Sequence, residues 1–272
     1  ERFYDYNRSG IKEPLAKAIN DHKIELKILS RYKDNFPRYL NVIRKIAFRE
    51  SEQARYVRMQ LLKDRLNDPV TAEDAAIQLE AIGRDAIPIL KGGLKSRVLE
   101  VQFHSALALA YLGESDGIPV LAKCVREEPA FRVFALCAMS VCEDAESSLQ
   151  LQELLNETSA ETRYGAFRAL TTIDEHHPAV HGEELHGGFR LHVLDTTGPP
   201  MIHLTTRKKA ELVLFGAHQK LITPIAVQAG EHIRLYAPAG SDTVTISRYQ
   251  LGRPDRRRDE STDLAEIIRT LA

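Results

Sequence analysis

The stretch AAIQLEAIGRDAIPIL, residues 75–90, returns 30 residues later as SALALAYLGESDGIPVLA, residues 105–122. Small and aliphatic residues at helical spacing, such as Ala76 and Leu79, are followed in both copies by a glycine break and then by Ile-Pro. A proline is favoured in the first turn of a helix, where its missing N–H costs nothing. Each copy therefore predicts two helices joined by a tight turn.

Weaker copies follow at a similar spacing. ALCAMSVCEDAESSLQLQELL, residues 135–155, begins 29 residues after Ala106, and AFRALTTID, residues 166–174, begins a further 31 residues on. One helical hairpin cannot bury its apolar face alone, whereas stacked copies share a continuous core. We therefore expect an α-solenoid over residues 51–175. Its period and pattern resemble HEAT-type repeats, particularly the short class found in phycobilin-lyase-like proteins.

The two ends of the chain differ from the repeats. EPLAKAIN, residues 13–20, predicts a short helix, residues 23–29 alternate like a strand, and residues 35–48 return to helical spacing. From residue 189 short strands separated by Gly, Pro and Asp turns are expected, and STDLAEIIRTLA, residues 261–272, predicts a helix. Either Ser261 or Thr262 is expected to cap this helix.

These patterns predict an α+β fold. Residues 1–50 and 189–272 are expected to pair in one discontinuous domain, with the solenoid of residues 51–175 inserted into it. Residues 176–188, rich in His and Gly, are expected to form the linker.

Composition restricts the partners. Lys and Arg total 37 against 38 acidic residues, so the chain has no overall field that attracts nucleic acid or an anionic membrane. No apolar run approaches the roughly 18–20 residues that span a bilayer. Partners are therefore expected to be proteins. The sequence starts at Glu1 rather than Met, which indicates a processed or trimmed chain.

The three cysteines do not form a recognisable site. Cys124, Cys137 and Cys142 are an odd number, lack C-x-x-C spacing and lie in apolar helical segments. This pattern argues against a disulfide framework and against a four-ligand zinc site. We expect these thiols to be packing residues.

Residues 113–117 read Gly-Glu-Ser-Asp-Gly and match the G-x-S-x-G nucleophile motif. That motif works on a sharp turn from a strand into a helix. Here a helical segment precedes it, and the repeat alignment places it at the turn between two helices. Ser115 is therefore expected to be a turn residue or a helix cap.

Half of the ten histidines lie in IDEHHPAVHGEELHGGFRLH, residues 173–192. His177 and His181 are four apart, and Glu183, Glu184 and His186 are further possible ligands. However, Pro178 disfavours helical geometry at His177, and the glycines loosen the rest. We expect a seam between array and β-rich segment rather than a metal site.

Two charged segments have simple interpretations. GRPDRRRDE, residues 252–260, mixes arginines with acids and has no aromatic residue, which predicts a solvated loop. In residues 35–48 Phe36, Leu40, Ile43 and Ala47 are expected to form one apolar stripe, with Arg38, Arg44 and Lys45 elsewhere. Such a helix packs on a sheet or is used between subunits.

The two ends together resemble the C-terminal part of bacterial flagellar basal-body P-ring proteins. The resemblance rests on EPLAKAIN, on the segment HKIELKILSRYKDNFPRYLNVIRKIAF and on the closing STDLAEIIRTLA, with AELVLFGAHQKLITPIAVQAG as intervening β structure. It implies a ring subunit in the periplasm, made from a precursor with a signal peptide.

We therefore expect a non-enzymatic scaffold that binds proteins by burying complementary surface. No catalytic, cofactor-binding or metal-binding residue is predicted, and no cofactor. The alternative is an enzyme or a chromophore-handling or ligand-handling protein of the phycobilin-lyase-like class. It requires an apolar groove with convergent acid and base groups.

Overall fold

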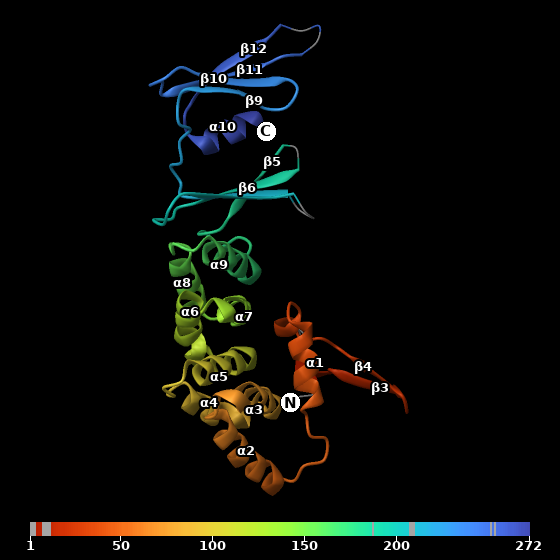
Figure 1. Ribbon diagram of the computed structural model, residues 1–272. Coiled ribbons are helices and arrows are strands. Elements are labelled where there is room, and N and C mark those ends of the chain that lie inside the picture. Colours follow the sequence, from red (N-terminus) through yellow and green to blue (C-terminus); the bar gives the residue numbers. More distant parts are fainter. Residues whose placement is uncertain (1–3, 7–11, 187, 207–209, 251, 253) are drawn as a thin grey trace. The chain divides into compact units, whose positions relative to one another are not determined.

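The computed structural model describes residues 4–6, 12–186, 188–206, 210–250, 252 and 254–272. Contacts within the chain divide it into two compact units, Glu1–Ile173 and Asp174–Ala272. The first contains the repeats and the second contains most of the strands (Figure 1).

Eight helices of the first unit form the helical array (Figure 1). Their pairing repeats along the chain: α3, α5, α7 and α9 pack side by side, and α4 and α6 each pack against the helix that follows in that row. The array therefore has the stacked hairpins that the repeat pattern predicts. The helices are α2 (Glu52–Leu66), α3 (Pro69–Ile82), α4 (Ile87–Gly93), α5 (Leu99–Leu112), α6 (Ile118–Glu127), α7 (Pro129–Val141), α8 (Ala145–Leu154) and α9 (Ala160–Ile173).

Equivalent short turns join the first two hairpins. The 3-10 turns η2 (Arg84–Ala86) and η3 (Ser115–Gly117) follow Gly83 and Gly113, which have positive φ angles of 89° and 84°. Glycine adopts such angles without steric cost, so it ends the first helix and lets the chain reverse. Pro88 and Pro119 then lie in the first turn of α4 and α6.

Small residues let the helices of the array approach closely. Ala72, Ala75 and Ala76 on α3 are fully buried with Leu79 and Leu109. Gly117 approaches the backbone of α5, because a Cβ there would lie 2.8 Å from Cα of Ala106. The alternation of small and large apolar residues in the repeats thus sets the helix spacing.

Residues before the array form two strand pairs and a helix. Strand β1 (Tyr4–Tyr6) pairs with β2 (Lys12–Pro14), and β3 (Ala16–Asn20) pairs with β4 (Lys23–Leu26). The turn η1 (Ser30–Tyr32) and helix α1 (Phe36–Arg44) follow. The strand expected in residues 23–29 and the helix expected in residues 35–48 are confirmed.

The helix expected over residues 13–20 is wrong. This segment contains the end of β2 and the whole of β3, because Asn20-Asp21-His22 turns the chain and lets β3 pair with β4. The Asn20 side chain accepts a hydrogen bond from the His22 N–H at 3.0 Å, a local turn bond that competes with helix formation.

Helix α1 lies on α3 of the array, and η1 contacts α7. The described residues of the segment 1–50 belong to the same compact unit as the repeats. The discontinuous domain of residues 1–50 and 189–272 stays a prediction.

The second unit has two four-stranded sheets. In one, the order is β5-β6-β8-β7, with β6 and β8 parallel; in the other it is β12-β11-β10-β9, all antiparallel. The strands are β5 (Gly182–Leu185), β6 (Phe189–Leu194), β7 (Met201–Thr205), β8 (Ala210–Phe215), β9 (Ile225–Gln228), β10 (Ile233–Ala237), β11 (Thr243–Arg248) and β12 (Arg256–Ser261).

Helix α10 (Leu264–Leu271) lies between these sheets (Figure 1). Its Ile267 packs with Leu235 and Ile246 of one sheet, and its Ala265 packs with Leu191 and Leu214 of the other. The unit thus has three layers, and the strand-rich segment closed by a helix is confirmed.

Three local predictions for this unit are corrected. Residues 256–260 of the expected solvated loop lie in β12, because pairing with β11 satisfies their backbone. The cap of α10 is Asp263, whose carboxylate accepts hydrogen bonds from the N–H groups of Ala265 and Glu266, rather than Ser261 or Thr262. The expected linker of residues 176–188 contains β5, which pairs with β6.

Within the described residues, no helix is both long enough and apolar enough to cross a bilayer.

Candidate functional site

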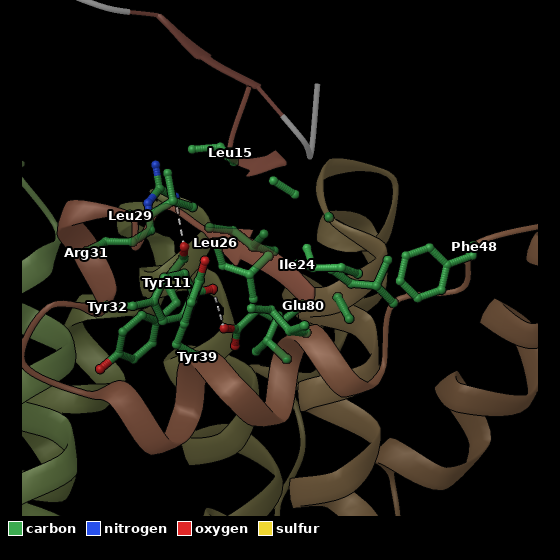
Figure 2. A pocket seen from close by; sticks show the side chains of 17 residues that line it. Leu15, Ile24, Leu26, Leu29, Arg31, Tyr32, Tyr39, Phe48, Glu80 and Tyr111 are labelled. Atoms are coloured by element: carbon green, nitrogen blue, oxygen red, sulfur yellow. Dashed lines mark hydrogen bonds between the residues drawn. The ribbon is translucent and has the colours of Figure 1, made fainter. Parts of the chain in front are cut away.

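An apolar pocket of about 280 Å³ lies in the first unit, between the β3–β4 hairpin, α1 and the array (Figure 2). Most of its lining is aliphatic or aromatic. Two of its members, Ile24 and Phe48, have 60% and 79% of their surface exposed. Other apolar members are Leu15, Leu26, Leu29, Ile43, Ile46 and Leu112.

A buried ion pair forms the floor of this pocket. Glu80 of α3 has a fully buried side chain, and Arg38 of α1, whose side chain is 12% exposed, donates to its carboxylate, with Nε 3.1 Å from Oε2. The hydroxyl of Tyr32 donates to Oε1 of the same carboxylate at 2.7 Å. Both carboxylate oxygens are therefore engaged by groups of the N-terminal segment, defined here as residues 28–48.

A second set of contacts holds the N-terminal segment on α5. Arg31 donates from Nη1 to the carbonyl oxygen of Tyr111 at 2.8 Å, and Asn35 donates from Nδ2 to the Tyr111 hydroxyl at 3.0 Å. The guanidinium of Arg38 lies 4.6 Å from the centre of the Tyr111 ring, and the Tyr32 ring stacks on it at 5.1 Å. Charge, hydrogen bonds and stacking thus all converge on Tyr111.

The surroundings of Tyr32, Tyr111 and Arg38 raise the pKa of each group. Desolvation, with a further contribution from the Glu80 carboxylate, raises the pKa of Tyr32 well above its ordinary value. Desolvation also raises the pKa of Tyr111. Burial alone would lower the pKa of Arg38, but the Glu80 carboxylate outweighs it and the pKa is raised. The cluster therefore keeps one charged arrangement.

The buried side of α1 differs from the predicted stripe. Tyr39 and Val42 are the buried residues of the helix, whereas Phe36 is 47% exposed. The helix packs on α3 rather than on a sheet. Arg38, which was expected outside the buried side of the helix, points toward Glu80. The buried side differs from the expected stripe because the charged Arg38 faces inward, where Glu80 compensates its charge.

Sequence reasoning missed Glu80, although one signal was present. It lies within the apolar stretch of the first repeat, and the equivalent position of the second copy is Ala110, which is also buried. A charge at a position that another repeat fills with a small apolar residue indicates a specific partner.

Ser115 begins the turn η3 between α5 and α6. Helix α5, rather than a strand, comes directly before this turn, so the exposed nucleophile of a strand-to-helix elbow is not formed there. The prediction that it is a turn residue is confirmed.

The thiols lie in packed surroundings. Cys124 and Cys142 are buried, and desolvation raises the pKa of each to about 11. Cys137 lies 3.6 Å from the Tyr111 hydroxyl, and burial raises its pKa as well. A thiol with a raised pKa is a weak nucleophile.

The histidines of residues 176–192 do not converge. The rings of His176 and His181 lie 6.1 Å apart, while His192 is buried on β6 and donates from Nδ1 to the carbonyl oxygen of Val180 at 2.7 Å. In the described part of the chain, no three His, Cys, Asp or Glu side chains are grouped as metal ligands would be.

Comparison with protein-family models and with curated proteins gives no match. Among solved structures, human deoxyhypusine hydroxylase in complex with glycerol is similar over 48% of this chain and 46% of its own, with 19% identity and a TM-score of 0.37. The matched region is thus less than half of that protein. The helical-repeat architecture follows from the stacked hairpins described above.

Proposed function

We propose that this chain is a non-enzymatic binding protein whose apolar pocket takes up an apolar group of a partner. The proposal rests on the difference in polarity between the walls of the pocket and its floor. The walls are aliphatic and aromatic, whereas the Glu80 carboxylate on the floor is bonded by Arg38 and Tyr32. Apolar burial is then the driving force, and the floor holds the walls in place.

The exposure of Ile24 and Phe48 supports a role in binding. Fully burying an exposed side chain of this size contributes about 1.5–3 kcal/mol. Association costs at least roughly 4 kcal/mol in lost freedom of motion, so these two side chains alone give only weak binding. A partner therefore has to fill the pocket as well as cover its rim.

The pocket volume bears on the ligand-handling alternative. Drug-sized ligands occupy pockets of roughly 300–1,000 Å³, and about 280 Å³ lies just below this range. This size favours a single side chain or a small molecule over a large chromophore. The floor also argues against the enzyme alternative, because its acid and base groups are committed to each other.

The resemblance at the two ends of the chain leads to a separate hypothesis. In it, the chain is a P-ring-like scaffold subunit in the periplasm. Residues 13–20 are one of the segments on which this resemblance rests. The resemblance matches them to a helix, whereas in the structure they contribute to the two strands β2 and β3. Light scattering tests the hypothesis, which expects concentration-dependent assembly. A monomer at high concentration contradicts it.

Binding of the neutral dye Nile red tests the proposed pocket. Ile24→Glu places a charge on the pocket wall, and Ile202→Glu is a matched control on β7 of the second unit, where Ile202 is 54% exposed. We expect I24E to lower the dye affinity at least tenfold and I202E to leave it unchanged. Equal effects of the two variants would place the dye elsewhere and overturn the proposal.

A further inference from the structure

The charges that line the pocket are unevenly balanced. Of the 17 lining residues, Glu80 and Arg31 are the charged ones. Glu80 is neutralised by Arg38, which is not one of the lining residues. Among the described residues no carboxylate forms an ion pair with Arg31, whose described hydrogen bond goes from Nη1 to the Tyr111 carbonyl oxygen. Within the described lining, Arg31 is therefore the charged side chain without an ion-pair partner.

This charge lies at one end of the apolar lining. In Figure 2, Arg31 lies beside Leu29 on one side of the pocket and Phe48 lies on the opposite side, with Leu26 and Ile24 between them. Arg31 is a partly buried member of the lining. The lining is thus apolar, with a cationic side chain at one end.

We propose that the pocket binds an amphipathic carboxylate, a single hydrocarbon chain of medium length whose carboxylate pairs with Arg31. A guanidinium has five N–H donors in a planar fork that matches a carboxylate, and one of them is used by the Tyr111 carbonyl. The volume of about 280 Å³ fits one such chain. This inference rests on the proposed function of the pocket and names its ligand class.

The neutral floor is essential to this ligand class. An unpaired Glu80 would repel a carboxylate in surroundings of low dielectric constant. Because Arg38 and Tyr32 both donate to Glu80, its charge is offset before any ligand enters. The buried pair therefore permits an anion in the pocket while it holds the N-terminal segment on the array.

Calorimetric titration of the whole chain with decanoate and with decanol, both kept below aggregation, tests the inference. A charge-assisted hydrogen bond is worth a preference of about ten- to hundredfold for the carboxylate. Arg31→Gln keeps a donor for the Tyr111 carbonyl and removes the charge, so it is expected to abolish that preference while decanol still binds. Arg31→Lys is expected to restore part of it.

Arg44→Gln is the matched control, because Arg44 is exposed on α1 and does not line the pocket. It is expected to leave both affinities unchanged.

Equal affinity of the wild-type chain for decanoate and decanol overturns the ligand class but leaves the apolar pocket supported. Failure of both ligands and of Nile red to bind overturns the proposed function itself. Tighter binding of a peptide with an apolar C-terminus than of decanoate also contradicts the inference.

Discussion

At the scale of single residues, Glu80 is expected to contribute most to the attachment of the N-terminal segment. Glu80→Gln keeps the shape of the side chain but leaves Arg38 as a largely buried, unpaired charge. Breaking a buried pair in this way costs about 3–5 kcal/mol, so we expect a loss of about 3 kcal/mol in the free energy of unfolding. Urea denaturation measures it.

The control for Glu80 is the exposed pair of Arg55 and Asp85, whose side chains are 32% and 57% exposed. Exposed pairs contribute about 0–1 kcal/mol. Asp85→Asn is therefore expected to change stability by less than 1 kcal/mol. A loss in E80Q no larger than that in D85N would contradict the assigned role of the buried pair.

His192 is expected to make stability depend on pH. Desolvation lowers its pKa below the ordinary 6.5, although the Val180 carbonyl and the Glu211 carboxylate oppose the shift and Arg190 and His181 add to it. Below about pH 6.5 the unfolded chain binds a proton that the folded chain does not. Stability is therefore lost as pH falls through this range, by at most about 1.4 kcal/mol per pH unit.

Thermal unfolding at pH 7.5 and 5.5 measures this dependence in the wild type and in His192→Asn. The variant is expected to lose less stability between the two pH values. His232→Asn, which replaces a histidine whose side chain is 74% exposed, is expected to behave like the wild type. A slope in H192N as steep as that of the wild type would show that other groups cause the loss.

The residue scale is also where the sequence was least informative. Arg38 and Glu80 are 42 residues apart, and no local pattern links them. Only the charge within an apolar repeat position indicated that Glu80 has a partner, and nothing in the sequence identified Arg38 as that partner. Long-range pairs of this kind depend on how α1 is placed on the array, which periodicity does not encode.

At the scale of elements, the turns between helices can be tested with two glycines. A Cβ at Gly117 would lie 2.8 Å from Cα of Ala106, whereas at Gly92, within α4, nothing lies within 4 Å. Gly117→Ala is expected to cost about 1–3 kcal/mol because α5 has to move. Gly92→Ala is expected to stabilise by up to about 1 kcal/mol, because it reduces the entropy of the unfolded chain.

Chemical denaturation of both variants measures the difference. Equal stabilities of G117A and G92A would mean that the close approach of η3 to α5 does not determine the spacing of the repeats.

The sequence predicts helices and strands well where their residue pattern is local and recurs from repeat to repeat. The hairpins of the array follow from their apolar spacing, from Gly83 and Gly113 and from the prolines that open α4 and α6. Residues 16–20 and 256–261 were assigned wrongly because pairing with a neighbouring strand outweighs their local preferences. The apolar pocket could not be predicted, since part of its lining comes from the β3–β4 hairpin, of which only the second strand was expected.

At the scale of the whole molecule, the histidines of residues 176–192 are expected to hold no stoichiometric metal. His176 and His181 are near each other, but Nδ1 of His177 accepts a hydrogen bond from the N–H of Ala179, and Nδ1 of His192 donates to Val180. After chelation and dialysis we expect well under one zinc per chain. Retention of one zinc per chain would contradict this interpretation.

The whole-molecule account rests on the pocket as the place where a partner binds. Methyl NMR of the 30.6 kDa chain during titration with decanoate tests this most directly. The account predicts saturable shifts of the Ile24, Ile43 and Ile46 methyl signals, with Ile202 unchanged. Shifts confined to Ile202 and other methyl groups of the second unit, or no saturable shift at all, would contradict it.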